Sequence, residues 1–283
     1  MAFVCEGMFL GIGGQKCAST WLYNILMQHP SIRLSRRKEV DFFSYYFDKG
    51  YEWYESNFDN SDATSLYGDV SPSYLIHPNA PSRAFNYNSD FKIILILRDP
   101  IDRAYSNHLH EIKKGHISIE KYDFTEGVKN NPLYLDQGRY GKHLERWLDV
   151  FPREQILVLF QEEIEENSLV IANQVFSFLG LTAVNSISNI RSNESVLYRN
   201  KFIGSSLWRV GFLLRRRGLG SIVEFLKNTS MVRQLRHRNR IPVRSVAAPI
   251  SQETESFLFQ FFLDDVRFLE ELLGRPVPWK RFH

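Results

Sequence analysis

The sequence predicts an α/β fold in which a mainly parallel sheet is flanked by helices, and three stretches support this prediction. Residues 8–26 pass from an apolar run through two glycines into apolar positions at helical spacing, the pattern of a strand, a tight turn and a helix. Residues 93–97 are consecutive apolar residues, typical of a strand buried in a parallel sheet, and Pro100 suits the first turn of a following helix. Residues 155–160 predict another buried strand, and 169–179 a helix that ends at a glycine.

The composition is that of a globular protein, and we expect one domain over residues 1–283. Apolar residues make up 43% of the chain and charged residues 24%. The net charge of +3 does not indicate a nucleic-acid-binding protein. With only Cys5 and Cys17 present, a reducing compartment is favoured over a disulfide framework. No signal peptide and no run of about 18 apolar residues is visible, so the sequence predicts a cytoplasmic protein without a transmembrane segment.

The turn after the first strand has the layout of a phosphate cradle. Gly13 and Gly14 allow a tight turn, and the first amides of the helix point outward without partners. Lys16, Ser19 and Thr20 add a charge and two hydroxyls to an anion held there. An ordinary strand-to-helix turn with an incidental lysine is the alternative.

This turn differs from the phosphate loop of nucleoside triphosphatases. Those loops place Ser or Thr directly after the lysine, where the hydroxyl holds Mg²⁺. Here Gln15 precedes Lys16 and Cys17 follows it, while the hydroxyls come later. We therefore expect a phosphate site without a metal ion.

A second cluster of charge follows the short strand predicted over residues 31–35. Glu39 comes after three cations in residues 36–38, and Asp41 lies two positions further on. The carboxyl end of a strand is where α/β sheets place ligands, so Glu39 is a candidate general base. A solvated charged turn is the competing interpretation.

A third cluster begins where the strand 93–97 ends. Arg98 follows the strand, and Ser106 lies about two helical turns later, which suits a second phosphate. Arg98 could instead cap its own loop. Asp99 could hold Mg²⁺ in a kinase-like site, but Arg98 directly before it argues against a metal.

These motifs resemble those of sulfotransferases that use 3′-phosphoadenosine 5′-phosphosulfate (PAPS). Residues 16–22 are similar to the 5′-phosphosulfate loop, Lys-x-Gly/Ala-Ser/Thr-Ser/Thr-x-Leu. Residues 38–43 resemble the Lys-Glu-x-His/Asp-Phe-Phe segment of heparan-type and related bacterial enzymes. Residues 98–106 resemble the 3′-phosphate signature Arg-Asp-Pro-x-x-Arg-Ala-Tyr-Ser. The resemblance covers about residues 8–181, followed by a variable part at about 182–283.

The resemblance implies a P-loop-like topology and sulfuryl transfer from PAPS to a hydroxyl or amine of a glycan or small molecule, with 3′,5′-adenosine bisphosphate (PAP) as product. It implies Glu39 as the base and Lys16 as the residue that stabilises the departing phosphate. A Mg²⁺-dependent kinase, or a membrane- or polyanion-binding protein with a vestigial nucleotide site, is the alternative. The nucleotide-binding residues implied are Gly14, Gln15, Lys16, Cys17, Ala18, Ser19, Thr20, Arg98 and Ser106.

The sequence also departs from the family pattern. Asp41 stands where histidine is common, Asp69 replaces glutamate in the Gly-Glu-x-Ser-Pro-Ser-Tyr signature, and Val70 stands where some glycan-modifying relatives carry lysine. These departures leave the acceptor open among glycan, lipid and secondary metabolite.

The remaining segments carry weaker predictions. The aromatic residues in 51–58 predict packing rather than a sugar-stacking surface. The cationic residues in 108–116 predict a solvated helix face, with acceptor binding as the alternative. The basic segment 193–249 could form a lid, an anionic-acceptor surface, a membrane-surface helix or a solvated region, and we assign no nucleotide contacts after Ser106. Residues 251–273 predict an amphipathic helix that packs on the core.

Overall fold

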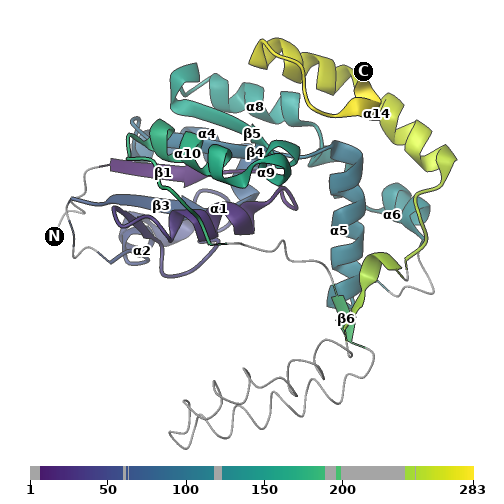
Figure 1. Cartoon of the computed structure of the whole chain (residues 1–283), viewed down its shortest axis with the longest axis horizontal. Helices are drawn as coiled ribbons and strands as arrows, with labels where there is room; N and C mark the ends of the chain where they lie inside the picture. Colours follow the sequence, from purple (N-terminus) through teal and green to yellow (C-terminus); the bar gives the residue numbers. More distant parts are fainter. Residues whose placement is uncertain are drawn as a thin grey trace, which may run out of the picture. The chain divides into compact units, whose positions relative to one another are not determined.

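The computed structural model describes residues 7–59, 62, 64–117, 123–188, 196–198, 240–245 and 247–283 (Figure 1). The chain divides into two compact units. The first comprises residues 1–107, 127–193 and 250–283, and the second comprises residues 108–126 and 194–249. The predicted sheet and all the predicted site residues belong to the first unit.

The first unit is built on a five-stranded parallel sheet with the order β2-β3-β1-β4-β5. This arrangement confirms the predicted fold class. The central strand β1 is apolar and buried because it is covered on both faces, as parallel sheets require. The strands are β1 (Gly7–Gly11), β2 (Ile32–Leu34), β3 (Leu66–Val70), β4 (Lys92–Leu97) and β5 (Ile156–Phe160).

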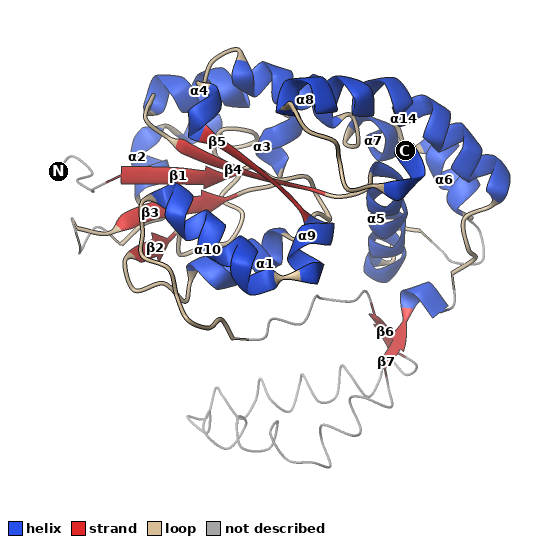
Figure 2. Ribbon diagram, turned by 45° about the horizontal axis from the view of Figure 1, so that its top comes forward, coloured by secondary structure: helices blue, strands red, loops and turns tan. Residues whose placement is uncertain are grey.

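Helices cover the two faces of the sheet (Figure 2). One face carries α1 (Ser19–Leu26), α9 (Gln161–Glu166) and α10 (Ser168–Leu179), and the indole Nε1 of Trp21 in α1 donates to Ser168 Oγ at 2.7 Å. The other face carries α3 (Ser73–Ile76), α4 (Ala80–Tyr87) and α8 (Tyr140–Leu148), where Arg146 donates to the carbonyl of Ile76 at 3.1 Å.

The C-terminal helix α14 (Gln252–Leu273) packs on α8, as the amphipathic pattern predicts. Ser251 caps its first turn, and Gly274 ends it in the left-handed conformation with φ 63°. The Asp265 carboxylate accepts hydrogen bonds from the amides of Gly141 and Lys142 at 2.9 and 3.0 Å. This cap comes from a distant segment, and it fixes the start of α8.

A short helix and a tight turn precede α8. The chain first forms α7 (Leu133–Asp136), turns at Gly138, and enters α8 at Tyr140. A Cβ at Gly138 would lie 2.7 Å from the ring of Phe262 in α14, so the turn is packed too closely for a side chain. The packing of α14, rather than local sequence, sets this boundary.

The aromatic segment around α2 (Tyr51–Glu55) is part of the core, as predicted. Tyr54 is fully buried and stacks on Phe42 with ring centroids 4.7 Å apart, and Phe58 is also buried. Tyr51 remains partly exposed at the edge of this cluster. The main role of the segment is packing against the loop that follows β2.

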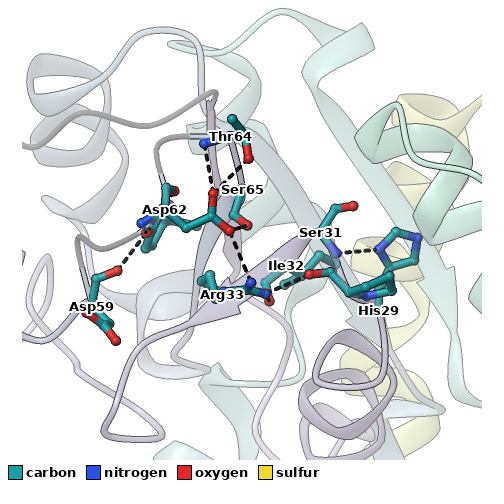
Figure 3. Close-up of polar contacts among 10 residues, drawn as sticks. His29, Ser31, Ile32, Arg33, Asp59, Asp62, Thr64 and Ser65 are labelled. Carbon is teal, nitrogen blue, oxygen red and sulfur yellow. Dashed lines mark hydrogen bonds and ion pairs between the residues drawn. The ribbon is translucent and has the colours of Figure 1, made fainter.

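Asp62 joins the segment before β3 to the neighbouring strand β2 (Figure 3). Its carboxylate pairs with the Arg33 guanidinium at 3.1 Å and accepts hydrogen bonds from Ser65 Oγ and Thr64 Oγ1 at 2.6 and 2.7 Å. These hydroxyl hydrogen bonds lower the pKa of Asp62 to about 2. The carboxylate thus orders the chain where it enters β3.

The solvated cationic face predicted for residues 108–116 is only partly correct. These residues lie on α5 (Pro100–Lys114) and the turn after it, and Lys113 and Lys114 are exposed. His108 is buried, its ring 5.4 Å from that of Phe124 in α6 (Phe124–Asn130), and burial lowers its pKa. His108 is therefore a neutral packing residue.

The second unit contains an antiparallel pair, β6 (Val196–Tyr198) and β7 (Arg240–Pro242). Most of the predicted basic segment 193–249, including the arginines at 215–217 and the apolar stretch 218–226, lies outside the described residues. Among the described residues, no helix is long and apolar enough to cross a bilayer.

Candidate functional site

The loop between β1 and α1 lies directly against β4. The Ile12 amide donates to the Ile94 carbonyl at 2.9 Å, and the Gly14 amide donates to Ile96 O at 3.1 Å. A Cβ on Gly13 would lie 3.0 Å from the backbone nitrogen of Ile96, so only glycine fits without a shift of the backbone. The glycines therefore seat the loop at the carboxyl ends of two adjacent strands.

The same loop presents unpaired amides at the start of α1. Lys16 and Ala18 adopt the left-handed conformation, with φ 73° and 57°. Within the described part of the chain, the amides of Gln15, Ser19 and Thr20 have no hydrogen-bond acceptor. Amides at a helix N-terminus favour an anion through their own donors and through the helix dipole. This geometry suits the predicted phosphate cradle.

Cys17 does not fit its predicted place among the binding residues. Its thiol is fully buried, 3.5 Å from the hydroxyl of Tyr140, and its amide donates to the Gly14 carbonyl at 3.1 Å. Burial raises the pKa of Cys17 to about 11, so the thiol stays neutral and unreactive. Cys17 therefore packs on the inner side of the loop, and neither its thiol nor its amide is available to bind an anion.

The loop after β2 carries the candidate base in a strained conformation. Glu39 and Asp41 have φ 61° and 57°. Together with Lys16 and Ala18 they are the only non-glycine residues with positive φ in the described ranges. Each such conformation costs about 1 to 3 kcal/mol and persists only where the surroundings enforce it. Among the residues that the structure describes, this strain lies in the two loops that hold the predicted catalytic residues.

Lys38 connects these two loops, and the sequence interpretation did not single it out. Its ammonium group donates to Thr20 Oγ1 in α1 at 2.9 Å and lies 3.5 Å from Glu39 Oε1. The Glu39 side chain is 47% exposed, so its carboxylate is accessible to an acceptor. The Lys38 ammonium group thus contacts both the cradle and the candidate base.

Asp41 is less accessible than Glu39. Its carboxylate accepts a hydrogen bond from Ser73 Oγ at 2.5 Å, and the Ser73 hydroxyl lies 2.7 Å from that of Ser44. Burial raises the pKa of Asp41, and the nearby Glu39 carboxylate adds to this effect. Asp41 is therefore tied into a local network, while Glu39 faces outward.

Arg98 and Ser106 follow β4, the strand against which the cradle loop lies. Arg98 follows β4 and Ser106 lies on α5, and both are half-buried. The side chains of Arg98 and Ser106 have no hydrogen bond or ion pair among the described residues. The charge of Arg98 lowers the pKa of Cys17, which places the guanidinium near the cradle. From β1 the chain continues to β2 at one edge of the sheet, and from β4 it continues to β5 at the other edge. The carboxyl ends of β1 and β4 therefore form the switch point at which α/β sheets bind ligands.

Asp99 has a structural role. It accepts hydrogen bonds from the amides of Ile101 and Asp102 at 2.9 and 3.1 Å, which caps α5, and it pairs with Arg281 at 2.9 Å. Burial raises the pKa of Asp99 to about 6, and Arg281 opposes this shift. The Asp99 carboxylate oxygens are therefore already bound by the first amides of α5 and by Arg281. Within the described ranges, no group of three or more His, Cys, Asp or Glu residues could hold a metal ion.

The segment that contains these motifs matches a known protein family. The family model described as the sulfotransferase domain matches residues 9–200. The human bifunctional heparan sulfate N-deacetylase/N-sulfotransferase 3 is 32% identical over 192 residues, which is 61% of this chain and 22% of the relative. The human heparan sulfate glucosamine 3-O-sulfotransferase 3B1 is 31% identical over 179 residues, 61% of this chain and 46% of the relative. The match therefore spans less than half the length of these curated relatives.

Solved structures support the fold. A sulfotransferase from Alicyclobacillus acidocaldarius has a TM-score of 0.68 at 21% identity, covering 96% of this chain and 97% of that chain. The sulfotransferase domain of the Synechococcus PCC 7002 olefin synthase has a TM-score of 0.52 at 13% identity, covering 97% of both chains. The shared architecture extends well beyond the matched motifs.

Proposed function

This chain belongs to the sulfotransferase family, and from that premise we propose that it transfers the sulfuryl group of PAPS to a hydroxyl or amine of a glycan or small-molecule acceptor. Two kinds of observation support the proposal. The cradle after β1 suits a phosphate, and the loop after β2 carries an accessible carboxylate. A transfer enzyme needs both features within reach of one bound donor.

The donor would bind along the carboxyl ends of β1 and β4. The amides of Gln15, Ser19 and Thr20 and the Lys16 side chain would hold its 5′-phosphate. Arg98 and Ser106 would hold the 3′-phosphate, which ATP lacks. These roles rest on the family motifs and on the positions of the residues at the switch point.

Glu39 would activate the acceptor. Its carboxylate takes the proton from the acceptor hydroxyl or amine as the acceptor oxygen or nitrogen forms a bond to sulfur. The bond between sulfur and the bridging oxygen of the 5′-phosphate breaks, and its electron pair leaves with PAP. Lys16 and the loop amides would stabilise the charge that develops on that phosphate.

The position of Lys38 is the observation that supports this mechanism best. Its ammonium group contacts Thr20 of the cradle at 2.9 Å and approaches the Glu39 carboxylate to 3.5 Å. The base and the phosphate site are therefore close enough for an acceptor atom on Glu39 to face a donor held on the loop. Lys38 would also add positive charge where the sulfuryl group moves.

For the acceptor, we propose amine- or hydroxyl-bearing glycans as the first class to test. The curated relatives act on heparan sulfate by name, one at nitrogen and one at a glucosamine 3-oxygen. Val70, which stands where some relatives carry lysine, argues against a strict requirement for an anionic chain. Amino sugars without anionic groups therefore belong in the same panel as N-desulfated heparan sulfate.

The donor site is tested by calorimetric titration of PAP against ADP, each with and without Mg²⁺. We expect tight binding of PAP that does not depend on the metal, because Arg98 and Ser106 recognise the additional phosphate. A preference for ADP with Mg²⁺ would favour a kinase instead. Binding of neither nucleotide would favour a polyanion- or membrane-binding role for the basic segment.

A further inference from the structure

The carboxylate of Asp69 is buried under the loop that carries Glu39. Asp69 is the fourth residue of β3 and is completely inaccessible to solvent. It accepts hydrogen bonds from Ser71 Oγ at 2.8 Å and from the Tyr74 hydroxyl at 2.5 Å. In the described part of the chain it has no ion pair with any cation. A buried carboxylate without a cation is costly, and hydroxyl donors are its main compensation.

Each of these two hydroxyls also holds a backbone amide of the Glu39 loop. The Asp41 amide donates to Ser71 Oγ at 3.0 Å, and the Phe42 amide donates to the Tyr74 hydroxyl at 2.9 Å. A hydroxyl has one proton, so donating it to Asp69 leaves its lone pairs directed at the amide. The carboxylate accepts from both hydroxyls at once and therefore fixes the direction of both.

The amides held in this way belong to the strained part of the loop. Glu39 and Asp41 are in the left-handed region, and Phe42 follows directly in the aromatic core. Such conformations persist where the surroundings over-determine them. The described contacts supply that constraint through a buried chain of hydrogen bonds from β3 to the loop.

We propose that Asp69 is a positioning residue for the transfer reaction: through Ser71 and Tyr74 it holds residues 39–42 in the conformation that directs Glu39 at the acceptor. This inference rests on the proposed function, because it assigns Glu39 as the base. Asp69 touches no substrate itself. Its effect is on the geometry of proton removal, whereas the donor cradle on the other loop does not depend on it.

The charge state of Asp69 gives this role a pH dependence. Burial raises the pKa of Asp69 to about 6, and the nearby Asp41 adds to this effect, whereas Tyr74, Ser71 and the Val40 amide oppose it. The charged or titratable groups facing it are Asp41, Tyr54 and Tyr74. A protonated Asp69 has to donate one hydrogen bond, so one of the two hydroxyls loses its fixed direction. Turnover should therefore fall as the pH drops through about 6.

The test compares Asp69→Asn and Tyr74→Phe with Tyr67→Phe as a matched control. Asparagine keeps the shape but has only one acceptor oxygen, and Tyr74→Phe removes one of the two hydroxyls. Tyr67 is also fully buried, on the same strand as Asp69, but its hydroxyl holds the carbonyls of Asp59 and Asp62 at 2.6 and 3.0 Å. Tyr67→Phe thus removes a comparable buried hydroxyl from a different loop.

We expect both loop variants to lower kcat with PAPS and N-desulfated heparan sulfate by about 10²-fold, the scale of a small misplacement of a reacting group. The Kd of PAP should stay at the wild-type value, and amide hydrogen exchange at residues 40–42 should become faster. The acid limb of the wild-type kcat profile should be absent in Asp69→Asn. Tyr67→Phe should change none of these quantities.

Wild-type kcat in both loop variants, or unchanged exchange at residues 40–42, would overturn the proposal. If Asp69→Asn fails to fold, Tyr74→Phe supplies the same measurements. A wild-type protein that neither binds PAP nor transfers sulfuryl would refute the proposed function instead. In that case the exchange data alone decide whether Asp69 fixes the loop.

Discussion

Replacing Lys38 by methionine should separate catalysis from stability. The Lys38 side chain is one third exposed and pairs with the carboxylate of Glu39, whose side chain is 47% exposed. Such pairs contribute about 0 to 1 kcal/mol to folding, so the melting temperature should change little. Loss of one donor that stabilises the transition state costs about 10² to 10³-fold in rate, or about 3 to 4 kcal/mol of barrier. Lys38→Met should therefore lose activity far beyond its loss of stability.

The assay is single-turnover sulfuryl transfer from PAPS, with thermal unfolding of the same samples. Lys49→Met is the control, because the Lys49 ammonium lies over aromatic rings, 4.5 Å from Tyr46 and 4.4 Å from Trp53, and has no ion pair among the described residues. The control should transfer at the wild-type rate. Normal turnover in Lys38→Met, or a loss of activity fully explained by unfolding, would refute a catalytic role for the contact between Lys38 and Thr20.

Three further outcomes follow from the site and its supports. Lys16→Ala should slow turnover at saturating donor by about 10²-fold or more, and near-normal turnover would remove Lys16 from the mechanism. Asp265→Ala removes the cap of α8 and should lower the free energy of unfolding by about 1 to 2 kcal/mol in urea titrations, whereas an unchanged midpoint would mean that water replaces the cap. Burial raises the pKa of Asp99 to about 6 from 3.8, so its deprotonation is disfavoured in the folded state and stability falls as the pH rises from about 4 to about 6. Asp99→Asn should remove this fall, which is at most about 3 kcal/mol, and a wild-type pH dependence in that variant would contradict the assignment.

The sheet and the phosphate loop could be predicted from the sequence because their signals are local. Five apolar residues in a row specify β4, and two glycines before an amphipathic stretch specify the turn into α1. Arg98 directly follows this apolar run and Ser106 lies about two helical turns later, so the sequence also predicts Arg98 at the end of β4 and Ser106 on α5. The motifs that identify the family are these same short, contiguous segments.

What could not be predicted depends on contacts between distant segments. The start of α8 is set by Asp265, more than a hundred positions away, and the oxygens of Asp99 are engaged by Arg281. The inward direction of Cys17 follows from Tyr140, and no periodicity reveals such a partner. The Ser-Pro-Ser-Tyr signature is recognisable in the sequence. The sequence does not show, however, that the hydroxyls of Ser71 and Tyr74 in this signature accept hydrogen bonds from amides of the Glu39 loop.

The most direct test of the mechanism is radiolabelled sulfuryl transfer from PAPS by wild type and Glu39→Gln, with PAP affinity measured on the same preparations. Wild type should label N-desulfated heparan sulfate or an amino sugar, and Glu39→Gln should bind PAP normally yet transfer nothing, since glutamine cannot accept the acceptor proton. Transfer at the wild-type rate by Glu39→Gln would contradict the mechanism. Loss of PAP binding together with transfer would make Glu39 a structural residue.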